Sequence, residues 1–508
     1  MLYPLSYGGR IWAEEDCTRF DGRCRNLFAP VAPGGDLAQW AGVTHIHVAG
    51  EIHVDPAARA PHWLSVPDDV NALLPKLWSR NVDKSADGVL EVAGLDVDRI
   101  AAAVGTPAYV VDAADLKARA REFAEAFAGW QVYYAGKSFL CTAVARWVVA
   151  EGLGVDVCSG GELAVALRAG VDSALIGLHG NNKSEEELRT GLAAGVGRII
   201  VDSFDEIGRL QRLARYLEVR PRVMVRVTTG VEAHTHEFIA TAHEDQKFGF
   251  SIAGGQAAEA LRACHESDVL DLIGIHSHIG SQIFDTEGFE VAARRTLRLA
   301  ADFSARCGVA LPELDLGGGF GIAYTSSDTP ATPAALAGAM RAIVDGECAA
   351  LGIAVPHLSI EPGRAISGPS TFALYRVGTV KKVLLDGGSS RLYVAVDGGM
   401  SDNIRTALYG AEYSATLASR RSDAPPVLSR VVGKHCEGGD ILVRDEFLPA
   451  DIAPGDLLAV PAAGAYSHSM ASNYNHVPRP PVVGVEDAEI TTLVRRETID
   501  DLLALDVG

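Results

Sequence analysis

The sequence predicts an α/β protein that combines a TIM-like (β/α)8 barrel with a mainly antiparallel β-domain. Three observations support this prediction. Short apolar runs alternate with helical patterns through the middle of the chain. Polar residues or glycines follow these runs, at the positions where a barrel carries its functional groups. After about Pro369 the helical patterns give way to β-rich runs separated by Gly and Asp turns, which indicates a second domain.

The composition is typical of a globular protein. Of the 508 residues, 48% are apolar and 22% are charged, and the length exceeds that of one ordinary domain. Lys and Arg number 45 against 65 Asp and Glu, and the net charge of −20 argues against nucleic acid or an anionic membrane as a partner. No run approaches the ~18 apolar residues of a membrane span, and the N-terminus lacks a secretory pattern. We therefore expect a cytoplasmic protein.

The eight cysteines are scattered and form no CxxC pair. We therefore predict reduced thiols and neither a disulfide framework nor a zinc site. Residues 1–75 are interpreted as an N-terminal extension of unknown role, in which Thr44–Val48 and Glu51–Val54 have the character of short strands. Alternating histidines there (His45, His47 and His53) could suggest a metal cluster, but such histidines are more often merely exposed, so no metal site is predicted.

The predicted barrel covers residues 108–368. It opens with a strand at Ala108–Asp112 and an amphipathic helix from about Ala114 to Ala128. Eight short apolar runs follow, namely Val132–Ala135, Val155–Cys158, Ala174–Leu178, Arg198–Val201, Val223–Val227, Leu272–His276, Glu313–Leu316 and Leu358–Ile360. The segments between them have helical spacing, as in Gly161–Ala169, Glu185–Ala194 and Ser203–Tyr216. Eight strands alternating with helices fit a closed barrel better than an open sheet.

The predicted β-domain has two parts. Residues 369–508 supply its C-terminal part, with β-rich runs at Phe372–Val380, Arg391–Val396, Val427–Val432 and Leu457–Ala462. Residues 76–107, which precede the barrel, are expected to join it as the N-terminal part.

Lys137 follows the apolar run Val132–Ala135 and Gly136. This pattern predicts an amine at the C-terminal edge of a buried strand, where partial desolvation would lower its pKa and suit Schiff-base chemistry. A lysine after a strand is more often a solvated loop residue. The other strand ends favour a function, because they carry Ser159–Glu162, His179–Lys183, Asp202, Arg226, His276–Ser281, Gly317–Gly319 and Glu361–Arg364.

Two of these strand ends suit a phosphorylated ring cofactor. Gly317–Gly319 offers backbone N–H groups without side chains in the way, and Ser281 could add a hydroxyl, although a lone glycine triplet is as often a flexible turn. Glu361 could hold a protonated ring nitrogen, as a pyridoxal phosphate (PLP) site requires, or could simply pair with Arg364. His278 could stack on a flat ring or be a satisfied core residue.

On a set of ordered motifs the chain resembles the diaminopimelate decarboxylase family, PLP enzymes of the alanine-racemase-like fold type. The resemblance covers about residues 75–508. The motifs are Tyr134–Lys137, Gly180–Ser184, His278–Gln282, Asp315–Gly319, Glu361–Arg364, Asp397–Arg405, Ala407–Ala411, His435–Glu437 and Gly464–Tyr466. The chain departs from common family residues at Gly136, Ser138, Gly438, Ser467 and His468, none of which removes a catalytic group.

The resemblance implies a role for each motif residue. Lys137 would carry PLP as a Schiff base, His278 would stack on its ring, and Glu361 would pair with the ring nitrogen. The other implied cofactor-binding residues are Ser281, Gly317, Gly318, Gly319, Gly363 and Tyr466, most of them at the phosphate. The implied substrate-binding residues are Arg364, Arg405, Tyr409, Glu437 and Tyr466.

The resemblance also implies a homodimer with shared active sites. Cys436 would reach the neighbouring protomer's site as the proton donor, and Glu437 would read the distal amino group of the substrate. The implied reaction is decarboxylation of meso-2,6-diaminopimelate to L-lysine. Decarboxylation of another basic amino acid or of a carboxylated polyamine stays open. Less favoured are an inactive PLP-binding regulator, since Lys137 and Cys436 are both present, and a racemase.

Overall fold

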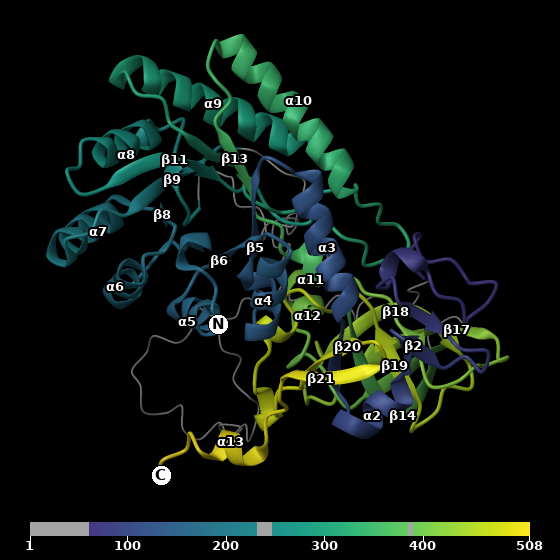
Figure 1. Ribbon diagram of the computed structural model, residues 1–508. Helices are drawn as coiled ribbons and strands as arrows, with labels where there is room; N and C mark the ends of the chain where they lie inside the picture. The colour runs from purple at the N-terminus through teal and green to yellow at the C-terminus, as the bar shows by residue number, and fades with distance from the viewer. Residues whose placement is uncertain (1–59, 231–245, 385–389) are drawn as a thin grey trace, which may run out of the picture.

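The computed structural model describes residues 60–230, 246–384 and 390–508 (Figure 1). The predicted strands and histidines before residue 60, and the first two cysteines, lie outside the described residues. Six further cysteines are described, and all are free thiols. Within the described ranges, no helix is long and apolar enough to cross a membrane.

A closed barrel of eight parallel strands forms the upper left of Figure 1. Its strands pair in the order β5, β6, β7, β8, β9, β11, β12 and β13, and β13 returns to β5. Their bounds are β5 Gln131–Ala135, β6 Gly154–Val157, β7 Ile176–Leu178, β8 Arg198–Val201, β9 Arg222–Thr228, β11 Asp271–Ser277, β12 Glu313–Asp315 and β13 His357–Ile360. A two-residue strand, β10 Phe250–Ser251, adds to β9. The predicted barrel is therefore confirmed, and each of the eight apolar runs overlaps one of its strands.

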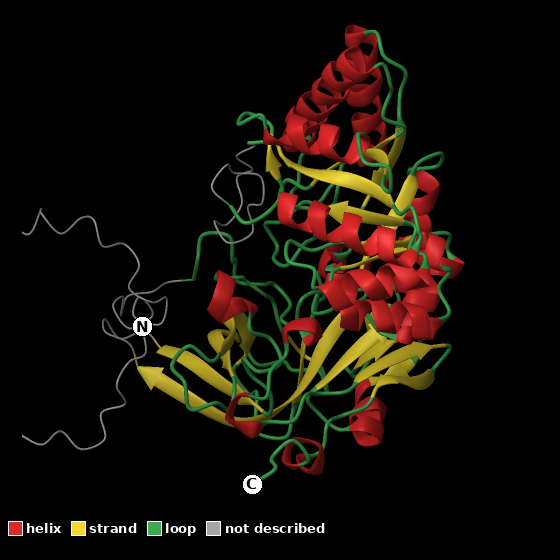
Figure 2. Cartoon of the chain, turned by 90° about the vertical axis from the view of Figure 1, so that its left-hand side faces the viewer, coloured by secondary structure: helices red, strands yellow, loops and turns green. Residues whose placement is uncertain are grey.

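Helices surround the barrel, and the barrel sits beside the second sheet (Figures 1 and 2). Those of the barrel are α3 Ala113–Ala126, α4 Thr142–Ala150, α5 Gly160–Ala169, α6 Glu185–Ala194, α7 Phe204–Leu217, α8 Gln256–His265, α9 Glu287–Cys307 and α10 Pro333–Leu351. Local sequence sets their ends: α6 begins at a capping box between Ser184 and Glu187, and ends at Gly195 in the left-handed conformation. The other helices are α2 Val97–Val104, α11 Arg364–Ser367, α12 Arg405–Tyr409 and α13 Ile499–Leu503.

The second sheet is mainly antiparallel, as the sequence predicts, and includes two parallel pairs. Its main path runs β18, β17, β15, β14, β4, β20 and β21, and the pairs β15–β17 and β4–β20 are parallel. The bounds are β4 Ala108–Asp112, β14 Thr371–Leu384, β15 Ser390–Val396, β16 Thr416–Leu417, β17 Pro426–Val432, β18 Ile441–Pro449, β19 Leu457–Val460, β20 Val482–Glu486 and β21 Glu489–Val494.

Strand β4 belongs to this second sheet. It pairs with β14 and β20, although the predicted barrel segment begins at its first residue. An apolar strand pattern gives no information about the partner strand, so the assignment to the barrel could not be made from the pattern alone. The chain thus enters the barrel only after β4, through α3.

The segment before β4 packs against the second sheet. It contains the small sheet of β1 Val82–Lys84, β2 Leu90–Val92 and β3 Leu95–Asp96. Leu90 and Val92 are fully buried in one apolar cluster with Phe372 and Leu374 of β14. This cluster is separate from the larger core, which runs from the barrel and its helices into the second sheet.

Candidate active site

A cavity of about 290 Å³ opens at the carboxyl ends of the barrel strands. Polar side chains from several strands line it, among them Lys137, Asp156, His179, Arg226, His276, His278 and Glu361. Lys137, His278 and Glu361, which the sequence predicts as cofactor ligands, are thus brought together. The edge of the barrel at which they meet is the one where this fold carries its chemistry.

Lys137 lies in a 3-10 turn, Gly136–Ser138, that directly follows β5. Two segments far away in the sequence hold this turn: Tyr466 N–H donates to Ser138 O at 2.9 Å, and a side chain at Gly363 would press against Ala135. The side chain of Lys137 is exposed, rather than partly desolvated as the sequence suggests, because the turn carries it beyond the last residue of the strand. The amine is therefore accessible within the cavity.

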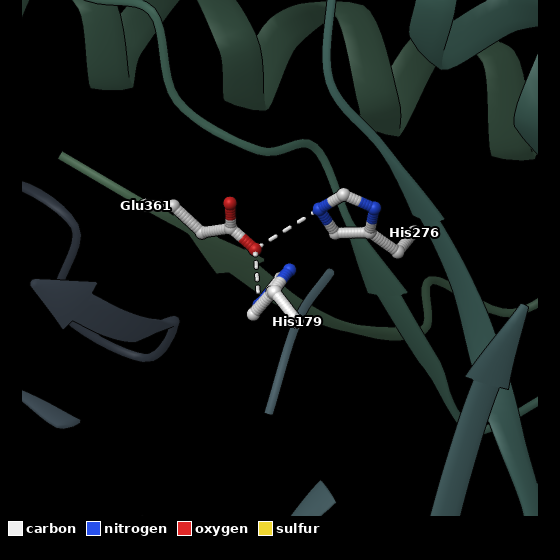
Figure 3. A group of neighbouring side chains, drawn as sticks. All are labelled: His179, His276 and Glu361. Carbon is white, nitrogen blue, oxygen red and sulfur yellow. Dashed lines mark ion pairs between the residues drawn. The ribbon is translucent and has the colours of Figure 1, made fainter. Parts of the chain in front are cut away.

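Glu361 directly follows β13 and is buried, with 7% of its surface exposed. Its Oε1 lies 3.0 Å from Nε2 of His276 and 3.3 Å from Nε2 of His179 (Figure 3). Glu361 does not form the alternative ion pair with Arg364. Arg198 is the nearest arginine to it among the described ion pairs, at 3.8 Å.

A buried charge network lies beneath the cavity. Arg198 Nη2 lies 2.6 Å from Asp315 Oδ2 and 3.7 Å from Asp156 Oδ1, and its guanidinium stacks 3.7 Å from the ring of Tyr133. Ser359 completes the network, since its hydroxyl donates to Asp315 at 2.6 Å. Arg198 and Asp315 thus form a close ion pair. The carboxylate of Asp156 lies farther from the same guanidinium and is stabilised less by it.

The protonation of the cluster follows from burial and these neighbours. Burial raises the pKa of Asp156 to about 7 and holds the pKa of His179 well below its ordinary value. Burial and Asp156 would also raise the pKa of Glu361. The imidazoles of His179 and His276 outweigh them, so the pKa of Glu361 lies below its usual range. Glu361 is consequently ionised near neutral pH, beside neutral His179.

Three donor atoms of this cluster, on His179, His276 and Glu361, lie within 4.8 Å of one another. Such an arrangement has the ligand types of a zinc site. The guanidinium of Arg198, however, already places a positive charge 3.8 Å from the same carboxylate oxygen. We therefore interpret the two histidines as close polar neighbours of Glu361 and not as metal ligands.

Gly317–Gly319 forms a tight cradle after β12. A side chain at Gly317 would clash with Ser277 O, one at Gly318 with Glu361 O, and one at Gly319 with Gly280 O. Gly317 and Gly319 also have positive φ angles of 71° and 108°, which favour glycine. Two backbone donors of the cradle are engaged within the chain: Gly317 N–H donates to Asp315 Oδ1, and Gly318 N–H donates to His278 Nδ1.

Two arginines meet around Tyr324, close to the cavity. Arg364 donates to the Tyr324 hydroxyl at 2.5 Å and to Ser281 Oγ at 2.9 Å. Arg405, at the start of α12, lies 4.7 Å from the Tyr324 ring and donates to the Tyr413 hydroxyl. Burial would raise the pKa of Tyr324, but Arg364 and Arg405 outweigh it, and the pKa lies below its usual value.

Of the remaining predicted residues, two lie near the arginines and two do not. Tyr466 packs on Arg364, whose guanidinium is 4.6 Å from the tyrosine ring. Tyr409 ends α12, one helical turn after Arg405, so that the two share a face. Cys436 and Glu437 are exposed on the turn between β17 and β18, and neither lines the cavity. Within one chain the structure therefore leaves these two residues apart from Lys137.

Sequence reasoning missed Asp156, Arg198, Tyr324 and Tyr413. A signal for the first two existed, because each is a charged residue inside a short, otherwise apolar strand. Buried charges are rarely retained without a partner. Tyr324 and Tyr413 stand in loops with no comparable pattern.

The structure supplies groups that fit a phosphorylated pyridine cofactor. Buried atoms of Asp156, His179, His276 and Glu361 have no well-aligned hydrogen-bond partner among the described residues, and they face the cavity that also holds Lys137. The glycine cradle lies next to Glu361 and Ser277 and admits no side chain. An amine, a buried carboxylate and a side-chain-free backbone loop are the three contacts that such a cofactor needs.

Residues 113–368 match the family profile described as pyridoxal-dependent decarboxylase, pyridoxal binding domain. Among curated proteins, the diaminopimelate decarboxylase of Mycobacterium tuberculosis is 54% identical over 440 residues, covering 86% of this chain and 98% of that protein. The diaminopimelate decarboxylase of Bacillus subtilis is 44% identical over 424 residues, covering 83% and 95%.

Solved structures of diaminopimelate decarboxylases are also similar to this chain. The diaminopimelate decarboxylase of M. jannaschii in complex with L-lysine superposes with a TM-score of 0.78 and 30% identity, covering 85% of this chain and 98% of that one. The Helicobacter pylori enzyme complexed with L-lysine has a TM-score of 0.73 and 28% identity, covering 81% and 99%. The likeness spans both the barrel and the second sheet.

Proposed function

Since the chain belongs to the diaminopimelate decarboxylase family, we propose that it removes CO2 from meso-2,6-diaminopimelate to give L-lysine, the last step of lysine biosynthesis. The enzyme is then a PLP-dependent carboxy-lyase. The single observation that carries this proposal is the meeting of Lys137 and buried Glu361 at one cavity beside a glycine cradle.

The proposed cofactor is pyridoxal 5'-phosphate, which when bound supplies a protonated pyridine ring that accepts the electron pair left by decarboxylation. Lys137 would hold it covalently, and His278, a neighbour of Lys137 in the cavity, would stack on its ring. Glu361 is buried and ionised, so it would keep the ring nitrogen protonated. The phosphate would lie among Ser281, Gly317, Gly318, Gly319, Gly363 and Tyr466, where it would compete with Asp315 and His278 for the glycine N–H groups.

The substrate carboxylate that is not lost would bind Arg364, Arg405 and Tyr409. Two guanidinium groups around one tyrosine form a fixed positive site in a mostly buried region, and a carboxylate can accept paired hydrogen bonds from such groups. Tyr466, packed on Arg364, would border both the phosphate and the substrate. This site favours a diacid over amino acids with a single carboxylate.

The active site would be completed in a homodimer. Cys436 and Glu437 are exposed and lie outside the cavity of their own chain, which agrees with a role in the site of a partner. There Cys436 would donate the proton that replaces CO2, and Glu437 would bind the distal ammonium group. A cytoplasmic location is also proposed. It is supported by the six free thiols among the described residues.

The proposal is tested by loading the full-length protein with PLP and following its visible absorbance and its CO2 release from meso-diaminopimelate. Lys137→Ala should lose both signals, because no other group would bind the cofactor covalently. Lys382→Ala, which removes an exposed lysine of β14, is the matched control and should keep both. Near-native turnover by the Lys137 variant would exclude this lysine as the cofactor-binding residue.

A further inference from the structure

We propose that His179 and His276 are positioning residues for Glu361: they bind one oxygen of this carboxylate and so hold it ionised, with its other oxygen available to a ring nitrogen. The inference rests on the proposed cofactor chemistry and concerns how this chain keeps that nitrogen protonated. The sequence analysis places both histidines at strand ends that favour a function, but it assigns neither of them a role.

The geometry supports this role. His276 at the end of β11 and His179 after β7 approach Glu361 from two different strands, and both present Nε2 to Oε1, at 3.0 and 3.3 Å. Figure 3 shows the second carboxylate oxygen turned away from both imidazoles. Two imidazole nitrogens this close to one oxygen would, as N–H donors, fix the rotation of the carboxylate and leave the lone pairs of the other oxygen for a further donor.

The surroundings of His179 explain why a neutral imidazole is suitable at this position. Burial holds the pKa of His179 well below its ordinary value, so this ring contributes an N–H group and not a positive charge. A neutral imidazole has one N–H, and to donate toward Glu361 it must carry the proton on Nε2. Such donation stabilises the ionised carboxylate without adding a second cation, beyond Arg198, that would repel a protonated ring nitrogen.

The other groups that face the cluster come from β6, β8, β9, β12, the turn after β5 and the segment after β11. Arg226 of β9 and His278 after β11 line the same cavity. Asp156 Oδ1 lies 3.2 Å from the same Nε2 of His179, so it competes with Glu361 for that proton. Arg198 is engaged by Asp315 at 2.6 Å and stands 3.8 Å from Glu361. Lys137 faces the cluster across the cavity. His276, whose Nε2 is closer to Glu361 than that of His179, should therefore have the larger effect.

Amide substitutions separate this role from simple packing. Gln places its side-chain NH2 about where Nε2 of histidine lies, whereas the shorter Asn reaches only about as far as Nδ1. His276→Gln and His276→Asn therefore both replace the imidazole with a carboxamide. They differ only in how far the amide NH2 extends from the backbone. The pair His179→Gln and His179→Asn repeats the comparison. His357→Gln, at the exposed start of β13, is the control for a histidine-to-amide change outside the cluster.

The readout is the 15N chemical shift of ring-labelled PLP bound to the full-length protein, which reports whether the ring nitrogen is protonated. The wild type, His276→Gln and His357→Gln should show a protonated nitrogen. His276→Asn should shift toward the unprotonated position, and its kcat should fall at least about tenfold with little change in substrate KM, because a proton shared with an unsupported carboxylate moves off the ring.

Two results would overturn the inference: an unprotonated ring nitrogen in the wild type, or a protonated one in both Asn variants. If His276→Asn does not fold, His179→Asn and the Gln variants still decide the outcome by the same shift. Failure of the proposed function is distinguishable, because the wild type would then release no CO2 from diaminopimelate whatever the state of the ring nitrogen.

Discussion

Arg364 donates a hydrogen bond to the hydroxyl of Tyr324, with Nη1 2.5 Å from the phenolic oxygen. Arg405 lies on the same tyrosine, 4.7 Å from its ring centre. Two buried guanidinium groups would repel each other. Tyr324 reduces that repulsion, because its hydroxyl accepts a hydrogen bond from Arg364 and its ring lies against Arg405. Tyr324 thus holds the two cations at which we place the substrate carboxylate.

Tyr324→Phe should raise the KM for diaminopimelate about tenfold, because Arg364 loses a hydrogen bond of the charge-assisted kind, worth ~1.5 kcal/mol. Cofactor affinity should not change, since Tyr324 is not among the residues proposed to bind the cofactor. Steady-state kinetics and PLP titration measure the two effects. Tyr393→Phe removes a phenol next to Arg430 in the second sheet and serves as the control. An unaltered KM would separate Tyr324 from substrate binding.

A shared site predicts that two inactive variants restore activity when mixed. Lys137→Ala lacks the cofactor-binding amine and Cys436→Ala lacks the proposed proton donor. A heterodimer of the two has one site with both groups intact. Co-expression in equal amounts should recover about a quarter of the wild-type activity, since half of the dimers are mixed and each has one working site. No recovery in isolated heterodimers would place Cys436 outside the partner's site.

Glu446 predicts a pH-dependent contribution to stability. Burial raises its pKa to about 7, although the backbone N–H groups of Ala415 and Phe447 donate to it. The folded state thus binds a proton that the unfolded state releases near its ordinary pKa, and stability from this group falls as pH rises from that value to about 7. Glu446→Gln should therefore increase the free energy of unfolding by roughly 1–3 kcal/mol at pH 8.

The same substitution should have little effect at pH 4, where the wild-type carboxyl is largely protonated in both states. Denaturant unfolding of the PLP-loaded dimer at the two pH values makes the comparison. Glu489→Gln, at an exposed position of β21, controls for the loss of a surface charge. An equal change at both pH values would show that Glu446 does not titrate as described.

Features that depend on local sequence could be predicted, whereas contacts between distant segments could not. The barrel strands could be found because each is a short apolar run, and the end of each run located Lys137, His276 and Glu361. The partners of β4 could not be found, since pairing between strands far apart in sequence leaves no local pattern. The contact of Tyr324 with Arg364 could not be found for the same reason, because it joins a loop residue to the first residue of α11, 40 residues away.

The most direct test of the proposed activity compares CO2 release from four substrates by the PLP-loaded protein: meso-diaminopimelate, ornithine, arginine and lysine. We predict release from diaminopimelate alone, because Arg364 and Arg405 require a second carboxylate and Glu437 a distal ammonium group. Release from a monocarboxylate amino acid, with none from diaminopimelate, would contradict the assigned substrate and the roles of Arg364, Arg405 and Glu437.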